Sequence, residues 1–341
     1  MKDTLTDANF PRTDDLRVYH LGLKAGEVAN RIITVGSPSR ANGLASLLDA
    51  EPKPFVLSSE RGFLTITGRF RNVPVSIVSI GMGSPNMDFF IREVRECVTG
   101  DMVIIRLGSC GGLVDIPVGS VVVPKASVAI NRNVDFDFVH PEDNREPAYR
   151  ISKPVSADPE LHETVRKAVQ GAKPPQSQAV ILTGTVNASA DSFYSSQGRQ
   201  TSFPDHNEDL IAHLLQSNPE AATLEMETFH LFHLAHCWSG HSAKNRPSAT
   251  APLTTGPVKP VMSQRETSSQ PVPAPASQDT VIKAAAVQMV FASRTSQDFI
   301  KPNEVSETER WTGQGVLTAL ANTAIPDQRL HPEVGSVWER S

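Results

Sequence analysis

The chain has 341 residues, of which 39% are hydrophobic, and its formal net charge is −5. This length allows one large core or two ordinary ones, and because no basic run stands out, nucleic acid is not an expected partner. Three cysteines argue against a disulfide framework, and no apolar stretch approaches the roughly 20 residues of a membrane helix, so we expect a cytoplasmic protein without a membrane partner.

The predicted elements begin after residues 1–16, a polar and acidic stretch that is no signal peptide and that we expect to be a flexible tail. Three β-branched runs follow, and each predicts a buried strand that ends in a turn of small residues. They are RIITVGSPSR (31–40), VSIVSIGMGSP (75–85) and VIIRLGSCGGL (103–113). Between the second and third runs, residues 86–98 have helical apolar spacing.

Strands and helices continue to alternate towards the C-terminus. The pattern predicts strands over 119–130, 179–189 and 281–296, a helix over 156–171, and a strand or loop followed by a helix over 222–238. From about 239 to 280 the chain is rich in Pro, Ser, Thr and Ala, and we interpret this stretch as a disordered surface insertion.

This alternation predicts an α/β fold. We expect a single domain over residues 17–341, interrupted by the insertion, with a central, mainly parallel mixed sheet covered by helices on both faces. In such sheets ligands bind at the carboxyl ends of strands, where the three glycine-rich turns are expected to lie.

Two arginines lie next to glycine turns at predicted strand ends. Arg106 follows the apolar residues 103–105, and Arg40 follows the turn at Gly36. A guanidinium at a buried strand end is costly unless an anion meets it, and glycine N–H groups can face such an anion. The pattern favours phosphate or sulfate, although Arg40 also fits an ordinary turn with a surface arginine. The chain has neither a P-loop nor a GxGxxG dinucleotide motif.

Two further segments carry polar side chains that suit a nucleoside. In DSFYSSQGRQ (191–200), Gln197 and Arg199 match the donors and acceptors of a pyrimidine edge, although the segment also fits a solvated loop. In LEMET (224–228), Glu225 and Glu227 suit a pair of vicinal hydroxyls, or equally the acidic start of a helix.

Histidines and cysteines are less informative. His230, His233 and His236 are three residues apart but have no evident fourth ligand, so we favour ordinary surface or core histidines and expect no metal. No histidine is placed in the sequence to activate Cys110, so we interpret it as lining a pocket.

These segments occur together in an order that resembles the nucleoside phosphorylase family, and within it the uridine phosphorylase branch. The resemblance runs from VYHLGL (18–23) to ASRTSQDFI (292–300) and the helix beyond it. It implies a pentosyltransferase of pyrimidine salvage that converts uridine and inorganic phosphate reversibly into uracil and ribose 1-phosphate. It implies no cofactor besides phosphate as the co-substrate.

The resemblance also implies roles for individual residues. Catalysis would rest on Arg106, Gln197, Arg199 and Glu227. Phosphate would be held by Gly36, Arg40, Arg61, Arg106 and Ser109. The ribose would be held by His20, Met226 and Glu227. The base would be held by Cys110, Gly111, Phe193, Gln197, Arg199 and Arg294. Since Arg61 and His20 would come from a neighbouring subunit, the implied assembly is a dimer, or a hexamer of three dimers.

Departures from the family pattern narrow the expected substrate and the expected ion binding. Purine-cleaving relatives carry an aspartate near the position of Arg294, so arginine here favours a pyrimidine. Ser37 and Ser39 stand where many relatives have aspartates, and Gly62 stands where some bacterial relatives have a cation-binding glutamate, so we expect no such cation. The alternatives are a phosphorylase for deoxyuridine, thymidine or a purine nucleoside, and a non-catalytic nucleoside-binding module.

Overall fold

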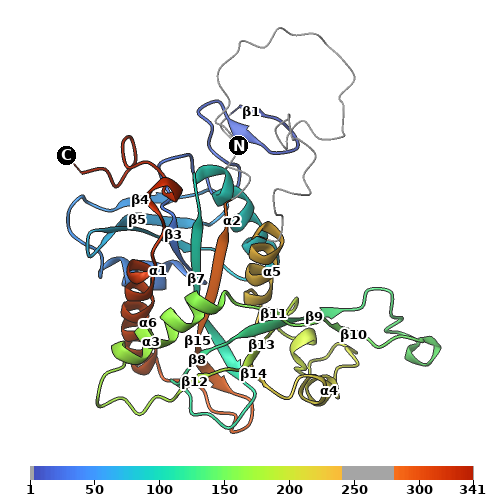
Figure 1. The fold of residues 1–341 in the computed structure, drawn as a ribbon. Helices are drawn as coiled ribbons and strands as arrows, with labels where there is room; N and C mark the ends of the chain where they lie inside the picture. The colour runs from blue at the N-terminus through green and yellow to red at the C-terminus, as the bar shows by residue number, and fades with distance from the viewer. Residues whose placement is uncertain (1–3, 240–279, 341) are drawn as a thin grey trace, which may run out of the picture.

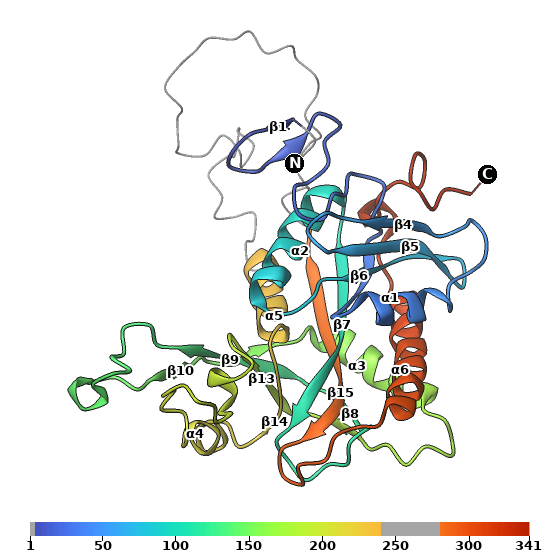
Figure 2. The same ribbon diagram turned by 180° about the vertical axis from the view of Figure 1, so that it is seen from behind.

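The computed structural model describes residues 4–239 and 280–340, and within these residues one mixed sheet of 13 strands forms the centre of the molecule (Figures 1 and 2). The expected insertion lies almost wholly outside the described residues. The strands are β1 (Leu5–Thr6), β2 (Arg12–Thr13), β3 (Arg31–Val35), β4 (Phe55–Ser58), β5 (Leu64–Phe70), β6 (Val73–Ser79), β7 (Met102–Gly112), β8 (Val121–Val123), β9 (Ala126–Arg132), β10 (Tyr149–Ile151), β11 (Val155–Ser156), β12 (Ile181–Thr183), β13 (Val186–Ala190), β14 (Ala221–Glu225) and β15 (Ile282–Ser293).

The helices cover both faces of this sheet, which confirms the predicted α/β architecture. They are α1 (Pro38–Ala45), α2 (Ser84–Cys97), α3 (Pro159–Ala172), α4 (Leu210–Ser217), α5 (Thr228–Ser239), α6 (Pro302–Asn322) and the short 3₁₀ helices η1 (Pro141–Asp143), η2 (Ser195–Gln197) and η4 (Asp327–Arg329). In Figures 1 and 2, α1, α3 and α6 lie on one side of β7 and β15, and α2 and α5 lie on the other.

The alternation of side chains along β7 and β15 divides the core between these two faces. Val103, Ile105 and Leu107 of β7 pack with α1, α3 and α6. Met102 and Ile104 of the same strand pack with α2 and α5. Because successive side chains of a strand point to opposite faces, a near-continuous apolar run is what a strand needs when both faces are covered.

Along one edge, β7 has first β3 and then β14 as its neighbour, and the interval between them contains the candidate site. β15 pairs in parallel with the opposite edge of β7 along the whole strand. On the first edge β3 pairs in parallel with residues 103–106, and β14 pairs in an antiparallel sense with residues 111 and 112. Within the described chain, residues 107–110 have no strand partner on that edge. The carboxyl ends of β3 and β14 therefore approach this gap from opposite directions.

The prediction that the third strand ends at Arg106 is wrong. β7 continues through the small residues to Gly112. The glycines stay in an extended strand because β15 pairs with β7 along its whole length, on the edge opposite the gap. The small residues are therefore strand residues beside the gap, not a loop.

Two other predicted strands are each divided in two. The stretch 119–130 forms β8 and β9, separated by Pro124 and Lys125, and the two strands have different neighbours in the sheet. The stretch 179–189 forms β12 and β13, separated at Gly184, whose φ is +74°. Pro removes a ladder donor and a positive φ breaks the extended conformation, so both sites end a strand.

Part of the expected N-terminal tail forms regular structure. β1 and β2 pair as an antiparallel ribbon. The ribbon is joined to α2 by an ion pair of 2.9 Å between Arg12 and Glu96, and Phe10 packs against the core face that holds α2. In the described part of the chain, no helix is both long and apolar enough to cross a membrane.

A substitution at Gly100, which lies between α2 and β7, tests whether the backbone has the described conformation there. The φ of Gly100 is +81°, and a Cβ there would collide with the carbonyl of Arg329. We expect Gly100→Ala to lower the free energy of unfolding by about 2 kcal/mol or more. Gly43 on α1 is the matched control, because it has no atom near its Cβ position. We expect Gly43→Ala to change stability by no more than about 1 kcal/mol, in the stabilising direction. Equal urea midpoints for the two variants would contradict the described backbone.

Candidate active site

Arg106 is the central residue of the gap between β3 and β14. Its side chain is buried, with a relative exposure of 3%, and Nη2 donates to Oε2 of Glu227 at 2.6 Å. Among the described residues, Nε and Nη1 have no hydrogen-bond partner although both are buried, and the nearest carboxylate oxygen to Nε is Oε2 of Glu225 at 3.8 Å, too far for a hydrogen bond. Unpaired buried guanidinium donors are costly, and an anion that accepts from them would remove the cost. The geometry therefore fits an oxyanion at this point.

Arg40 lies beside Arg106 and faces the same gap. Its Nε donates to Oε1 of Glu309 at 2.7 Å, and its Nη1 donates to the Leu107 carbonyl at 3.4 Å, where the edge of β7 opposite β15 has no described strand neighbour. Burial lowers the pKa of Arg40 and the carboxylate of Glu309 opposes that effect, while the nearby charge of Arg106 also lowers it. A Cβ at Gly36 would lie 3.9 Å from Nη2 of Arg106, so Gly36 borders the gap. Three of the five predicted phosphate residues, Gly36, Arg40 and Arg106, are thus brought together.

Two roles are predicted for Glu225 and Glu227: the acidic start of a helix and the binding of vicinal hydroxyls. In the structure Glu225 takes the first. Glu225 accepts the backbone N–H groups of Glu227 and Thr228 at 2.9 and 3.0 Å, so it occupies the start of α5. Asn187 and Ser189 of β13 also donate to Glu225. Burial raises the pKa of its carboxyl, and the charge of Glu227 adds to that rise.

Glu227 instead faces Arg106 and the turn before α2. Its Oε1 accepts from the backbone N–H of Gly83 at 2.6 Å, while its Oε2 accepts from Arg106. Each carboxylate oxygen keeps a further lone pair, because a carboxylate has about four acceptor positions. Glu227 can therefore accept from a ligand's hydroxyl groups without losing either contact.

The base-binding residues predicted from DSFYSSQGRQ gather at η2. Gln197 is buried, and its side-chain oxygen accepts from Nη1 of Arg199. The Arg199 guanidinium lies 3.9 Å from the ring centroid of Phe193. Burial lowers the pKa of Arg199, and the charge of Arg294 lowers it further. With its oxygen engaged by Arg199, the Gln197 amide presents its NH₂ group as a donor.

Arg294 joins this cluster to β7. Its backbone N–H donates to the Gly112 carbonyl at 2.9 Å, and a Cβ at Gly111 would lie 3.9 Å from its Cγ. Its guanidinium donates to the backbone carbonyl of Gln197 at 3.0 Å. The Arg294 side chain thus contacts the backbone of the turn predicted to bind the base, while its own backbone is bonded to β7, the strand that carries Arg106.

The other two predicted residues of β7 lie between these clusters. Ser109 is partly buried and is paired with Met289 of β15. The Cys110 thiol donates to the Met289 carbonyl at 3.5 Å and packs in an apolar cluster with Val122 and Val290. Burial raises the pKa of this thiol well above its ordinary value. The thiol therefore does not join the polar groups of the site.

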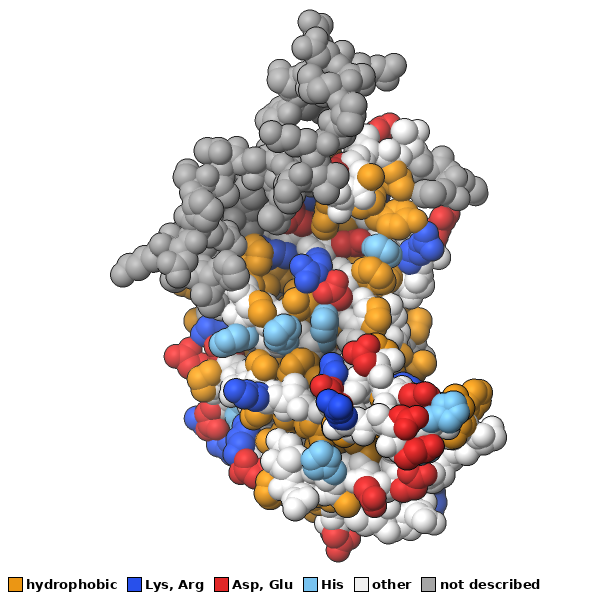
Figure 3. Space-filling view, turned by 90° about the vertical axis from the view of Figure 1, so that its right-hand side faces the viewer, with side chains coloured by type: hydrophobic (Ala, Val, Ile, Leu, Met, Phe, Trp, Pro, Cys, Tyr) orange, Lys and Arg blue, Asp and Glu red, His pale blue; other side chains and the backbone are white. Residues whose placement is uncertain are grey.

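Met226 lines a hollow of about 260 Å³ beside Glu227. The hollow also contains His230 and His233 of α5, and Asp191, two residues before Phe193. Histidine side chains gather beside hydrophobic ones on the side of the molecule shown in Figure 3. Within the residues that the structure describes, no three His, Cys, Asp or Glu side chains are grouped so as to hold a metal. The His230 ring instead lies 3.2 Å from Asp88.

His20 and Arg61 form a separate group within the chain. Arg61 is exposed and donates to the Tyr19 hydroxyl, and the rings of Tyr19 and His20 are 4.8 Å apart. His20 Nδ1 lies 2.6 Å from Glu93, and its ring stacks on Phe89. No described contact joins this group to Arg40 or Arg106. The two residues expected to act across an interface thus share one surface.

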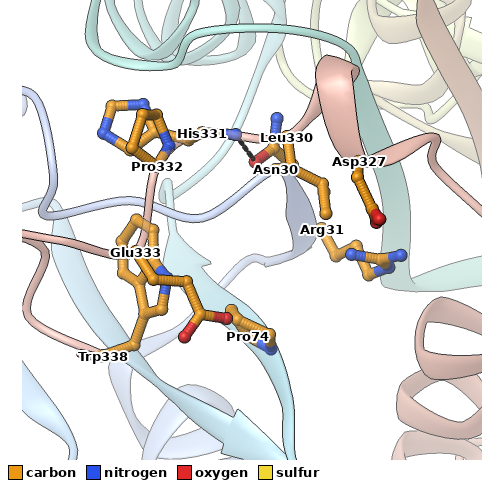
Figure 4. A pocket seen from close by; sticks show the side chains of 9 residues that line it. All are labelled: Asn30, Arg31, Pro74, Asp327, Leu330, His331, Pro332, Glu333 and Trp338. Carbon is orange, nitrogen blue, oxygen red and sulfur yellow. Dashed lines mark hydrogen bonds between the residues drawn. The ribbon is translucent and has the colours of Figure 1, made fainter. Parts of the chain in front are cut away.

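A larger cavity lies at the opposite ends of the strands. It measures about 330 Å³, and Figure 4 shows Arg31 and Asp327 on one side of it, with His331 and Trp338 on the other. Arg31 begins β3, whereas Gly36 follows its end. The cavity is therefore separated from the gap by the length of β3, and it contains none of the predicted site residues.

Sequence reasoning missed several residues that build the site. Glu309 comes from α6 and binds Arg40, and Asn187 comes from β13 and binds Glu225. Neither stands in a motif, because each reaches its partner only through the fold. Gly83 had a visible signal: the glycine pair in IGMGSP marks a turn whose free N–H can meet a carboxylate.

The comparisons with known proteins decide the family. The phosphorylase superfamily model matches residues 30–239, which is more than half of the chain. The chain belongs to the nucleoside phosphorylase family. It is accordingly an enzyme, a pentosyltransferase, as the sequence predicted.

Individual relatives fall in both substrate branches of the family. A solved structure from a study of two uridine phosphorylases of the oomycete Phytophthora capsici is 35% identical, with a TM-score of 0.77, and the match covers 94% of this chain and all of that one. The uridine phosphorylase of Thermococcus kodakarensis is 28% identical over 70% of this chain and 79% of its own length. A DeoD-type purine nucleoside phosphorylase of a Jannaschia species is 28% identical over 69% of this chain and 85% of its own.

Proposed function

We propose that this enzyme is a uridine phosphorylase, which converts uridine and inorganic phosphate reversibly into uracil and ribose 1-phosphate. The main support is the pair of buried donors on Arg106 that have no hydrogen-bond partner among the described residues, in a gap that Glu227 also faces. A phosphate there would accept from Arg106 and Arg40. The names of the relatives from Phytophthora and Thermococcus support uridine as the nucleoside.

The proposed reaction needs charge stabilisation at two points. A phosphate oxygen attacks the anomeric carbon of ribose as the bond to the base breaks, and the bonding pair leaves with uracil. Positive charge develops on the sugar, where phosphate is close, and negative charge develops on the base, where Gln197 and Arg199 donate. Donors fixed before the reaction give the largest part of such stabilisation. Glu227 would accept from the ribose hydroxyls and fix the sugar between them.

A purine nucleoside is the second candidate substrate, because the Jannaschia relative is named as a purine phosphorylase. The base pocket disfavours it. Arg199 and Arg294 add two positive charges beside Gln197. Asp191, the acid in the hollow beside Met226, already accepts from the Arg132 N–H and the Ser196 hydroxyl. Arginine and amide donors suit the carbonyl oxygens of uracil instead.

The proposal also covers the setting of the enzyme. We place it in pyrimidine salvage in the cytoplasm, without a cofactor or metal. The group formed by His20 and Arg61 would complete the site of a neighbouring subunit, in a dimer or in a hexamer of dimers. The described contacts of this group are with Tyr19 and its neighbours and not with Arg40 or Arg106, which supports that arrangement.

Uridine cleavage is expected to require phosphate. The measurement is release of uracil, followed by ultraviolet absorbance or chromatography, with and without inorganic phosphate, together with identification of ribose 1-phosphate. Inosine and thymidine are the comparison substrates, and we expect uridine to have the highest kcat/KM. Equal release of uracil without phosphate would show a hydrolase, and faster cleavage of inosine would show the purine branch.

A further inference from the structure

Two side chains from outside hold the backbone of the turn from Ser195 to Arg199. Asn207 Nδ2 donates to the carbonyls of Ser195 and Arg199, at 2.8 and 3.1 Å. Arg294 donates to the carbonyls of Gln197 and Gly198, at 3.0 and 3.4 Å. The shape of the turn that carries Gln197 and Arg199 is therefore fixed by these bonds at both of its ends and in its middle.

Asn207 connects this turn to the core. The residue is 2% exposed, and its side-chain oxygen accepts from Nε2 of Gln200 at 2.7 Å. Its own carbonyl accepts from the N–H of Leu210, the first residue of α4, and Leu210 packs in the hydrophobic core beside β13. Every polar atom of the Asn207 side chain is thus used to fasten the turn to α4.

The turn's own bonds are local: the N–H groups of Gln197 and Arg199 donate to the Tyr194 carbonyl, that of Gly198 donates to the Ser195 carbonyl, and the Ser196 hydroxyl donates to Asp191. Before it, Phe193 and Tyr194 are 47% and 58% exposed. Gly198 has a φ of +63°, and a Cβ there would lie 2.9 Å from Cγ1 of Ile211. A short turn with a left-handed residue and exposed neighbours keeps one shape only when its carbonyls are bonded. Without those bonds the turn would lose its single shape in the free enzyme, and ligand binding would have to restore it at a cost in affinity.

We propose that Asn207 is a positioning residue for recognition of the base, which it serves by holding Gln197 and Arg199 in place before the nucleoside arrives. The assignment deepens the proposed function and rests on it for the identity of the ligand. Asn207 touches neither substrate. Its effect is on uridine and not on phosphate, because Arg40 and Arg106 are held by other residues.

Asn30 provides a matched control. It is also buried, its Nδ2 donates to the carbonyls of Thr99 and Asp101 at 2.9 and 2.6 Å, and its Oδ1 accepts from the N–H of His331 at 2.8 Å. It therefore makes the same kind of bonds, but beside the cavity at the other end of β3. Asn30 also donates to the Arg329 carbonyl at 3.5 Å, so Asn30→Ala removes at least as many hydrogen bonds as Asn207→Ala, but from a different place.

The experiment compares these two variants with Asn207→Asp. The aspartate keeps the size and the acceptor for Gln200 but cannot donate to either carbonyl. For Asn207→Ala and Asn207→Asp we expect the KM for uridine to rise about tenfold, with the KM for phosphate changed by less than about twofold. For Asn30→Ala we expect both KM values to stay within about twofold of wild type. If the alanine variant does not fold, Asn207→Ser keeps one donor and should give a smaller rise.

Amide hydrogen exchange provides a readout that does not depend on the substrate. We expect residues 195–200 to exchange faster in Asn207→Ala and unchanged in Asn30→Ala. Unchanged exchange there, or a KM for uridine no higher than that of Asn30→Ala, would overturn the assignment. If the wild-type enzyme does not cleave uridine with phosphate, the proposed function fails, and the exchange comparison alone then decides whether Asn207 holds the turn.

Discussion

Arg106→Ala is expected to lower kcat/KM for phosphorolysis of uridine by about 1000-fold or more. The variant removes two buried donors that have no hydrogen-bond partner among the described residues, and it also leaves the Glu227 carboxylate buried without its arginine. The first loss acts on phosphate and the second on the sugar. The measurement is the initial rate at several phosphate concentrations, which separates the KM for phosphate from kcat.

Two comparison variants separate catalysis from folding. Arg106→Lys keeps a positive charge beside Glu227 but not the planar fork, so we expect it to fold and still to lose about 100-fold in kcat/KM. Arg69→Ala also removes a buried arginine that is paired with a carboxylate. The partner here is Glu333, which lines the distant cavity. This variant should lose stability and keep its KM for phosphate. A normal KM for phosphate in Arg106→Lys would remove Arg106 from the phosphate site.

Mixing two inactive variants is expected to restore activity. His20 lies in one group with Arg61, and Gln197 lies in the other with Arg199, with no described contact between the groups. In a dimer with shared sites, each site takes one group from each subunit. His20→Ala and Gln197→Ala then leave one intact site in every mixed dimer. With equal mixing, activity should recover to about a quarter of the wild-type value.

The control for this experiment uses both substitutions in one chain. When that double variant is mixed with wild-type subunits, each mixed dimer has two sites with one defect each, so no activity is gained beyond that of the wild-type dimers present. Arg61→Ala mixed with Gln197→Ala should recover as the first pair does. If dimers shown to be mixed stay as inactive as their parents, His20 acts within its own chain or the sites are not shared.

The sequence predicted the elements whose patterns are local. The runs that became β3, β6 and β15 are apolar and β-branched, and the helix that became α3 begins with Asp158 as its N-cap and Pro159. Such signals need only neighbouring residues. The end of β7 could not be predicted in the same way, because its glycines remain extended only through pairing with β15, far along the chain.

The candidate site shows the same limit. Arg40, Arg106 and Glu227 could be recognised because each stands in a short motif, and the fold does bring them together. Their supports are different. Glu309 reaches Arg40 from α6, and Asn207 reaches the turn from Ser195 to Arg199 from just before α4. A single asparagine or glutamate carries no local signal for such a contact, since the partner is chosen by the topology.

The pairing of β7 with β15 also orders the events of folding on the ribosome. β15 is the last strand of the described chain, yet it pairs with β7 from Met102 onward. Contacts so distant in sequence form late, because a long loop must close before they are made. Until then the nascent chain exposes one edge of β7, and an unpaired strand edge is the kind of surface that associates with other chains. A chain that stops before Ile282 would therefore lack both the ladder that keeps the glycines of β7 extended and the protection against aggregation that this ladder provides.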